Sequence, residues 1–384
     1  MTTTLVTGFI DLGAREPRPP GKALDDYVRH AHWLFAAAAP MVVFAEPHVL
    51  ARLLTLRRAG APTRWIVIDF ESLRWHPALE RIAGAATGSA SVWLNPAKDT
   101  PGYLAVTYGK TEWLGRAARE NPFGTAAFAW VDLGIAGLAT DVGRVALSEL
   151  DAGLADLSAA TVCAGALRAC AIEAVPADAF SRREVYHGRP RWPVAGGVLA
   201  GGADDIAWFA EAVATEIGAC LGAGIASTEE MVWGAVLHRH PERFACHYGT
   251  HGSCLANFTV PRADVHMILD AAWRAFERDC REEGEARLAF AESAPESGGA
   301  AEWLLRAGCR LARASRWGSP AEARAAAMAL FHGACNDPRL REQLDAAWLR
   351  LAPDLAPHAA AAPMPFPATQ TGPACCINLD RHPL

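Results

Sequence analysis

The chain has 384 residues, of which 51% are hydrophobic and 20% charged, with a formal net charge of −6. These values are typical of a globular protein with more than one domain, and the lack of a basic excess argues against nucleic acid as a partner. The sequence shows no signal peptide, no apolar run long enough for a transmembrane helix, and no Cys-x-x-Cys pair among its ten cysteines. We therefore expect a cytoplasmic protein with reduced thiols.

Short apolar runs alternate with segments of helical spacing in the N-terminal part of the chain. This alternation is typical of a mainly parallel sheet with helices on both faces. A long polar stretch then precedes a helix that Asn121 and Pro122 end. The predicted strands are 5–10, 41–45 and 65–69, the helices are 24–37, 47–58 and 110–120, and the polar stretch is 95–108.

A buried strand is predicted at residues 126–132, and it ends on one carboxylate, Asp132. In an open α/β sheet, ligands bind outside the carboxyl ends of the strands. Asp132 would lie at that edge, where its oxygens suit Mg²⁺ or Mn²⁺. The competing interpretation is that Asp132 caps the turn that leaves the strand.

The pattern changes in the last third of the chain. Four glycines occur in a predicted strand at 194–202, and a last short strand is predicted at 244–248. From residue 261 onward only helical segments are predicted, and a Pro-rich stretch, 355–373, is typical of a stiff linker. We expect a sheet domain, a helical region, and a linker that leads into the start of a further domain, with the bounds 1–258, 259–355 and 356–384.

Four segments, taken together, resemble the HtrL/YibB-like family of candidate bacterial glycosyltransferases. The segments are 4–13, 121–134, 195–202 and 229–244. The resemblance covers about residues 5–258 and implies a GT-A type fold, in which an Asp-x-Asp-like site at a strand end binds a divalent metal and the diphosphate of a nucleotide-sugar donor. Trp130 stands where the first acid of that pattern would be. Because of this departure, an alternative is a site that binds metal weakly or has no activity.

The tail carries a second resemblance. Residues 377–383 are similar to the opening strand of the lipooligosaccharide-type glycosyltransferases of family 25. This similarity implies a second transferase module in the same polypeptide.

With the resemblance, ten residues become candidates for the site. Glu229 and Glu230 are the candidate acids on the acceptor side, and Asp132 with His247 or His251 is the candidate metal site. The residues expected to bind the donor are Thr7, Asp11, Lys110, Asp132, Gly196 and Gly197.

Each candidate also has an ordinary structural interpretation. Asp11 would serve the turn after the first strand, and Lys110 would be a solvated surface lysine. The two glycines would form a bulge, and each histidine would be a hydrogen-bonded loop residue. Glu230 fits a capping box with Ser227 as N-cap, which leaves Glu229 as the better candidate for the acceptor side.

The sequence thus predicts a cytoplasmic, hexosyltransferase-type enzyme of cell-surface polysaccharide synthesis. It would move a sugar from a nucleotide diphosphate donor to a glycan or another hydroxyl acceptor, with Mn²⁺ or Mg²⁺. The first alternative is a non-catalytic sugar-nucleotide or glycan-binding module with a degenerate site. The second is a nicotinamide-dependent enzyme, against which the lack of Gly-x-Gly-x-x-Gly after the first strand argues.

Overall fold

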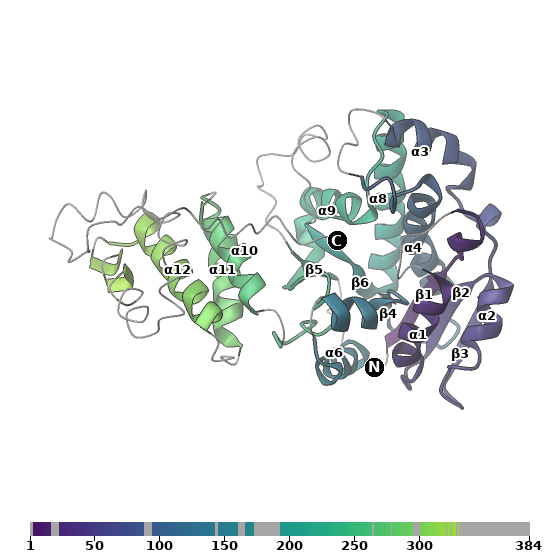
Figure 1. Cartoon of the computed structure of the whole chain (residues 1–384), viewed down its shortest axis with the longest axis horizontal. Helices are drawn as coiled ribbons and strands as arrows, with labels where there is room; N and C mark the ends of the chain where they lie inside the picture. The colour runs from purple at the N-terminus through teal and green to yellow at the C-terminus, as the bar shows by residue number, and fades with distance from the viewer. Residues whose placement is uncertain are drawn as a thin grey trace. The chain divides into compact units, whose positions relative to one another are not determined.

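The chain divides by its internal contacts into two compact units, residues 1–264 and 265–384 (Figure 1). The predicted boundaries after residues 258 and 355 stay predictions. The predicted linker and tail, 356–384, lie outside the described residues, as do the residues of the second similarity. The computed structural model describes residues 3–16, 23–87, 94–142, 145–159, 166–172, 193–262, 265–277, 279–294, 300–319, 321–323, 325–327 and 329.

A mixed sheet of seven strands forms the centre of the first unit, in the order β3-β2-β1-β4-β6-β5-β7. Strand β6 runs antiparallel to both of its neighbours, and the other strand pairs are parallel. The predicted α/β architecture with a mostly parallel sheet flanked by helices is therefore confirmed. The strands are β1 (Thr3–Phe9), β2 (Met41–Ala45), β3 (Thr63–Val67), β4 (Ala127–Val131), β5 (Leu167–Ala171), β6 (Val194–Gly202) and β7 (Phe244–Tyr248).

Helices cover both faces of this sheet, and short 3₁₀ turns connect several of them (Figure 1). The α-helices of the first unit are α1 (Leu24–Phe35), α2 (Pro47–Leu53), α3 (Leu79–Ala86), α4 (Pro101–Glu120), α5 (Ile135–Gly137), α6 (Leu147–Ala159), α8 (Ala203–Gly222) and α9 (Glu229–Arg239). The 3₁₀ turns are Leu12–Ala14, Phe70–Ser72, His76–Ala78 and Pro241–Arg243, and a π-helical turn spans Leu138–Val142.

The alternation of side chains along each strand produces two cores. Phe128 and Trp130 of β4 pack with α3, α4, α8 and α9 on one face, whereas Ala129 and Val131 pack with α1, α2 and α6 on the other. All four of these side chains are buried, as a strand covered on both faces requires. Asp132 directly follows β4, and the alternation of side chains places it on the same face of the sheet as Phe128 and Trp130. This is the face that α4 covers.

Helix α4 begins nine residues before its predicted start at Lys110, so the expectation of a polar loop at 95–108 is partly wrong. Thr100 is the N-cap, its hydroxyl accepts from the Tyr103 N–H at 3.1 Å, and Pro101 occupies the first helical position. These are ordinary start signals, which the polarity of the stretch obscured. Asn121 ends the helix in a left-handed conformation (φ 38°), in agreement with the sequence.

In the second unit, α10 (Val265–Glu277), α11 (Arg281–Ser293) and α12 (Ala300–Trp317) pack together. A Cβ on Gly284 would lie 2.3 Å from Phe276, and one on Gly308 would lie 2.2 Å from Trp273. Both glycines therefore let α11 and α12 approach the aromatic side chains of α10 closely. The sequence predicts α10 and α12 but not α11. In the part of the chain that the structure describes, no helix is long and apolar enough to cross a membrane.

Candidate functional site

The strand order places a topological switch point between β1 and β4. The chain lays β2 and β3 on one side of β1 and then returns to lay β4 on the other side. In open α/β sheets the crevice at such a point, outside the carboxyl ends of the strands, is where ligands bind. Asp11 lies two residues beyond β1 and Asp132 directly follows β4. Both predicted carboxylates therefore lie at the edge where a ligand is expected.

Asp132 turns its side chain toward Lys110 of α4. The Lys110 ammonium lies 3.0 Å from Oδ1 and 3.1 Å from Oδ2 of this carboxylate. The Trp130 indole N–H also donates to Oδ1, at 2.6 Å. The Asp132 backbone N–H donates to the carbonyl of Gly197 at 2.9 Å, which joins the end of β4 to β6. Asp132 is thus held by an ion pair, and the predicted turn cap is not its side-chain role.

Lys110 is buried and is surrounded by oxygen atoms, so the interpretation as a solvated surface lysine is wrong. Besides Asp132, its ammonium donates to Oε1 of Glu229 at 2.7 Å and lies 3.5 Å from the carbonyl oxygen of Gly196. Burial alone would lower the pKa of Lys110, but the charges of Asp132 and Glu229 outweigh burial and raise it. Lys110 is therefore a permanent cation at the sheet edge.

Glu229 and Glu230 are the first two residues of α9, and they reach β6 in different ways. Glu229 is buried beside Lys110, and burial raises its pKa. Oε1 of Glu230 accepts from the Gly196 backbone N–H at 3.1 Å and lies 3.1 Å from Nδ1 of His251. The predicted capping box is wrong, because Thr228 is the N-cap without a side-chain hydrogen bond and the Ser227 hydroxyl contacts Met231. Glu230 binds β6 and His251 instead of its own helix.

His251, which follows β7, pairs with Glu230. Burial opposes the charged form of both groups. Even so, the His251 charge and the Gly196 N–H lower the pKa of Glu230 to about 2, and Glu230 raises the pKa of His251. Each charge thus favours the other, and the two side chains have low exposure, 27% and 17%. His251 belongs to the site more clearly than His247.

Gly196 and Gly197 lie where the pairing of β5 with β6 loses its regular register, which supports the bulge interpretation. A Cβ on Gly196 would lie 2.8 Å from Oε1 of Glu229 and 3.0 Å from Cγ of Glu230. The close approach that Gly196 permits is therefore to the carboxylates of α9. A Cβ on Gly197 would lie 3.2 Å from the sulfur of Cys254, so this position is also tight.

Three predicted residues do not join this group. Thr7 is buried in β1, and its hydroxyl has no partner among the described residues. Asp11 accepts from the Gly13 N–H at 3.0 Å and pairs with His48 at 3.2 Å, which is the predicted turn chemistry. His247 is buried in β7, and Nε2 donates to the Cys254 carbonyl at 2.6 Å because a carbonyl oxygen can only accept. Burial lowers the pKa of His247 to about 3.

Two aromatic residues at the site have no part in the sequence prediction. Burial and the charges of Glu229, Tyr27, Glu230 and Asp132 raise the pKa of Tyr103. The Tyr108 hydroxyl donates to the Ser227 carbonyl at 2.6 Å, just before α9. Tyr103 and Lys110 are seven residues apart on one face of α4. This spacing would have revealed Tyr103 if the helix had been extended to its true start.

The donors around Asp132 do not fit a divalent metal well. Over the residues that the structure describes, no cluster of three or more His, Cys, Asp or Glu side chains is arranged to hold a metal ion. Both oxygens of Asp132 already accept hydrogen bonds, and the nearest charge is the Lys110 ammonium. Two unit charges of the same sign about 4 Å apart repel by roughly 4 kcal/mol at an effective dielectric constant near 20, and a divalent ion would meet about twice that.

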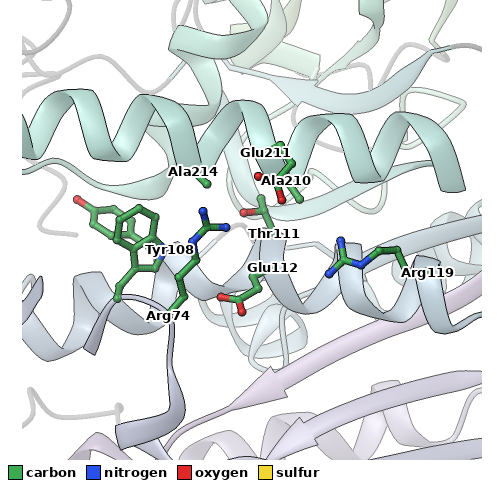
Figure 2. A pocket seen from close by; sticks show the side chains of 9 residues that line it. Arg74, Tyr108, Thr111, Glu112, Arg119, Ala210, Glu211 and Ala214 are labelled. Atoms are coloured by element: carbon green, nitrogen blue, oxygen red, sulfur yellow. The ribbon is translucent and has the colours of Figure 1, made fainter. Parts of the chain in front are cut away.

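A separate cavity of about 80 Å³ lies between α4 and α8 (Figure 2). Figure 2 shows Glu112 projecting from α4 and Glu211 from α8, with Arg74 and Arg119 nearby. Burial raises the pKa of Glu112. None of the ten predicted site residues lines this cavity, although Tyr108 does.

Comparison with known proteins gives one partial match. Residues 1–148 match the family model of a bacterial protein of unknown function, HtrL/YibB. The match covers Lys110 and Asp132 but stops before Gly196 and Glu229, so it includes one side of the site only. No curated protein matches the chain.

Proposed function

We propose that this chain is a glycosyltransferase of the GT-A type, which moves a sugar from a nucleotide diphosphate donor to a hydroxyl acceptor. One observation carries the proposal: Lys110 joins Asp132 and Glu229 at the switch point of a mostly parallel sheet. The sequence resemblance of four segments leads to the same expectation, although the family that residues 1–148 match is of unknown function. We include in the proposal the cytoplasmic location that the sequence predicts.

The proposed transfer has simple requirements. The acceptor oxygen forms a bond to the anomeric carbon, the bond from that carbon to the diphosphate breaks, and the diphosphate leaves with the electron pair. Positive groups must meet the charge that develops on the leaving group. Lys110 and His251 are basic groups at this edge, and neighbouring carboxylates raise the pKa of both, which favours their positive forms.

A base must also take the proton of the acceptor hydroxyl if the base and the leaving group lie on opposite sides of the sugar. Glu229 and Glu230 differ in their suitability for this role. Burial raises the pKa of Glu229, whereas the pKa of Glu230 is lowered to about 2. Because a general base works best with a pKa near the working pH, we propose Glu229 as the proton acceptor and Glu230 as the residue that positions His251.

Asp132→Asn tests the proposal, because it keeps the shape of the side chain and removes its charge. In calorimetric titrations with a panel of nucleoside diphosphates and nucleotide sugars, we expect wild type to bind at least one of them. The variant should lose at least about tenfold in affinity. Its melting temperature should change little, because Lys110 keeps Glu229 as a partner.

Asp204→Asn, at an exposed position in the first turn of α8, is the matched control and should bind as wild type does. If Asp132→Asn binds the same ligands with unchanged affinity, Asp132 has no role in binding and the proposed site is wrong. If no member of the panel raises the melting temperature or binds in the calorimeter, the proposed donor class is wrong.

A non-catalytic binding module is the second candidate, and one observation favours it. Trp130 stands where the Asp-x-Asp-like pattern of the GT-A fold would have an acid, and its N–H donates to Asp132. Assays for release of nucleoside diphosphate, with and without a hydroxyl acceptor, separate the two candidates. Donor binding without any release would support the binding module.

A further inference from the structure

We infer that Lys110 is a built-in replacement for a divalent metal at this edge, so that ligands bind beside Asp132 without a metal ion. The identity of the ligand, a nucleoside diphosphate, rests on the proposed function. The replacement of the metal rests on the geometry around the ammonium alone.

The ammonium of Lys110 has an oxygen environment of the kind that a bound cation has. A lysine carries three N–H donors and no acceptor. Three groups surround Nζ: the carboxylate of Asp132 at 3.0 Å, Oε1 of Glu229 at 2.7 Å, and the Gly196 carbonyl oxygen at 3.5 Å. These oxygens come from the end of β4, the start of α9 and β6, which are elements far apart in the chain. The ammonium thus joins three elements as a structural cation would.

Trp130 also contacts both Asp132 and Lys110, and it stands where the Asp-x-Asp-like pattern of the GT-A fold would have an acid. Its N–H donates to Oδ1 of Asp132 at 2.6 Å, and the Lys110 nitrogen lies 5.9 Å from the centre of its ring. An indole adds a hydrogen-bond donor and a cation-binding face, whereas a second acid would add a negative charge. The end of β4 therefore carries one carboxylate, Asp132. Its single negative charge is balanced by the single positive charge of Lys110, whereas a divalent metal would carry two.

Removal of the ammonium would leave a set of ligands that suits a hard cation. Asp132 and Glu229 would lose their common partner, and Glu230 lies next to Glu229 with its carboxylate at the Gly196 N–H. Mg²⁺ and Mn²⁺ bind to carboxylate and carbonyl oxygens, and water completes their coordination. A variant without the ammonium should therefore gain a metal site that wild type lacks.

The experiment is a Mn²⁺ titration of the full chain, monitored by electron paramagnetic resonance. We expect wild type to show no saturable Mn²⁺ site. Lys110→Met should bind one Mn²⁺, and its binding should saturate at a concentration at least about tenfold below the highest one at which wild type shows none. The double variant with Asp132→Asn should lose this gain. Lys98→Met, which also removes one positive charge, 3.9 Å from the carboxylate of Asp99, should gain no site.

Two results would overturn the inference. One is a Mn²⁺ site in wild type that disappears in Asp132→Asn, and the other is a folded Lys110→Met that gains no site. If Lys110→Met does not fold, the wild-type titration still decides between a metal site and none.

Nucleoside diphosphate binding gives an independent readout. Its affinity should be the same within about twofold in EDTA and in Mn²⁺, and binding only with Mn²⁺ would contradict the inference. A lack of nucleotide binding under both conditions would count against the proposed function. The replacement of a metal by Lys110 would then be tested by the Mn²⁺ titration alone.

Discussion

The chain contains the tripeptide Asp-Leu-Gly twice, at 11–13 after β1 and at 132–134 after β4, and the two copies have different roles. Asp11 caps its own turn through the Gly13 N–H, whereas Asp132 points away from its turn toward Lys110. The same local sequence at the same edge of one sheet thus gives a turn residue in one case and a member of an ion group in the other.

The neighbours of each aspartate explain the difference. The backbone N–H of Asp11 donates to the buried Glu46 at 2.7 Å, so a carboxylate already occupies the space beside it. The backbone N–H of Asp132 donates to a neutral carbonyl of β6, which leaves room for the ammonium of Lys110. The comparison teaches that tertiary partners decide whether an aspartate after a strand serves a turn or a site.

The largest effect should come from Lys110→Met, which leaves the carboxylates of Asp132 and Glu229 together without a cation. Loss of one partner from a buried ion pair costs about 3–5 kcal/mol, and because Asp132 is 32% exposed we expect the lower part of that range. Urea unfolding followed by circular dichroism measures the free energy.

Adding Glu229→Gln to Lys110→Met should recover part of the loss, because it removes the more deeply buried charge. A loss below about 1 kcal/mol in the single variant would show that the Lys110 group is no more important for stability than an ordinary surface pair.

The second effect concerns Glu230 and His251, and it should depend on pH. The pKa of Glu230 falls from 4.5 to about 2 on folding, so its stabilisation is complete above pH 4.5 and is lost as the pH falls toward 2. The pKa of His251 rises above 6.5, so its share is complete below pH 6.5 and is lost at higher pH.

The stability difference between wild type and His251→Gln should therefore be largest between about pH 4.5 and 6.5, at roughly 1.5–3 kcal/mol. Urea unfolding across the range from pH 2 to 9 measures it. Lys98, Glu229 and Lys110 also face this pair. Asp204→Asn, at the exposed position in the first turn of α8, therefore serves as the control, which should leave the shape of the profile unchanged. A flat difference across the range would disprove the charged pair.

The smallest effect should come from Asp11→Ala. This change removes the cap on the Gly13 N–H and an exposed pair with His48, which together contribute about 1 kcal/mol. Thermal unfolding of this variant beside Asp132→Ala sharpens the comparison of the two tripeptides. If Asp11→Ala also abolished nucleotide binding, Asp11 would be part of the site, and the distinction between the two aspartates would fail.

Much of the fold follows from local patterns in the sequence. The bounds of β2 and β7 agree with the predicted 41–45 and 244–248. In β2 a fully buried apolar run between Pro40 and Pro47 explains the agreement. The first two turns of α4 were missed because polar residues suggested a loop, although Thr100 and Pro101 mark a helix start. The membership of Asp132, Lys110 and Glu229 in one site came from resemblance, not from periodicity.

The remaining features of the site depend on contacts between distant residues. No local rule says that Glu230 would bind the N–H of Gly196 instead of capping α9, because the two residues are 34 positions apart. Similarly, Trp130 is predictable as a buried residue of β4, but its hydrogen bond to Asp132 requires the side-chain geometry. The pairing of Glu230 with His251 likewise joins residues that no local sequence pattern connects.

The link between α4 and α9 has a consequence for how the chain folds. Two contacts, Lys110 to Glu229 and Tyr108 to Ser227, each close a loop of 119 residues. Such a long loop has a large closure entropy, which is compensated only when β4, β6 and the intervening elements have paired. The ion group should therefore form late, after most of the sheet. A growing chain lacks Glu229 as a partner for Lys110 until the start of α9 has been synthesised, so this contact reports that α4 and α9 have met.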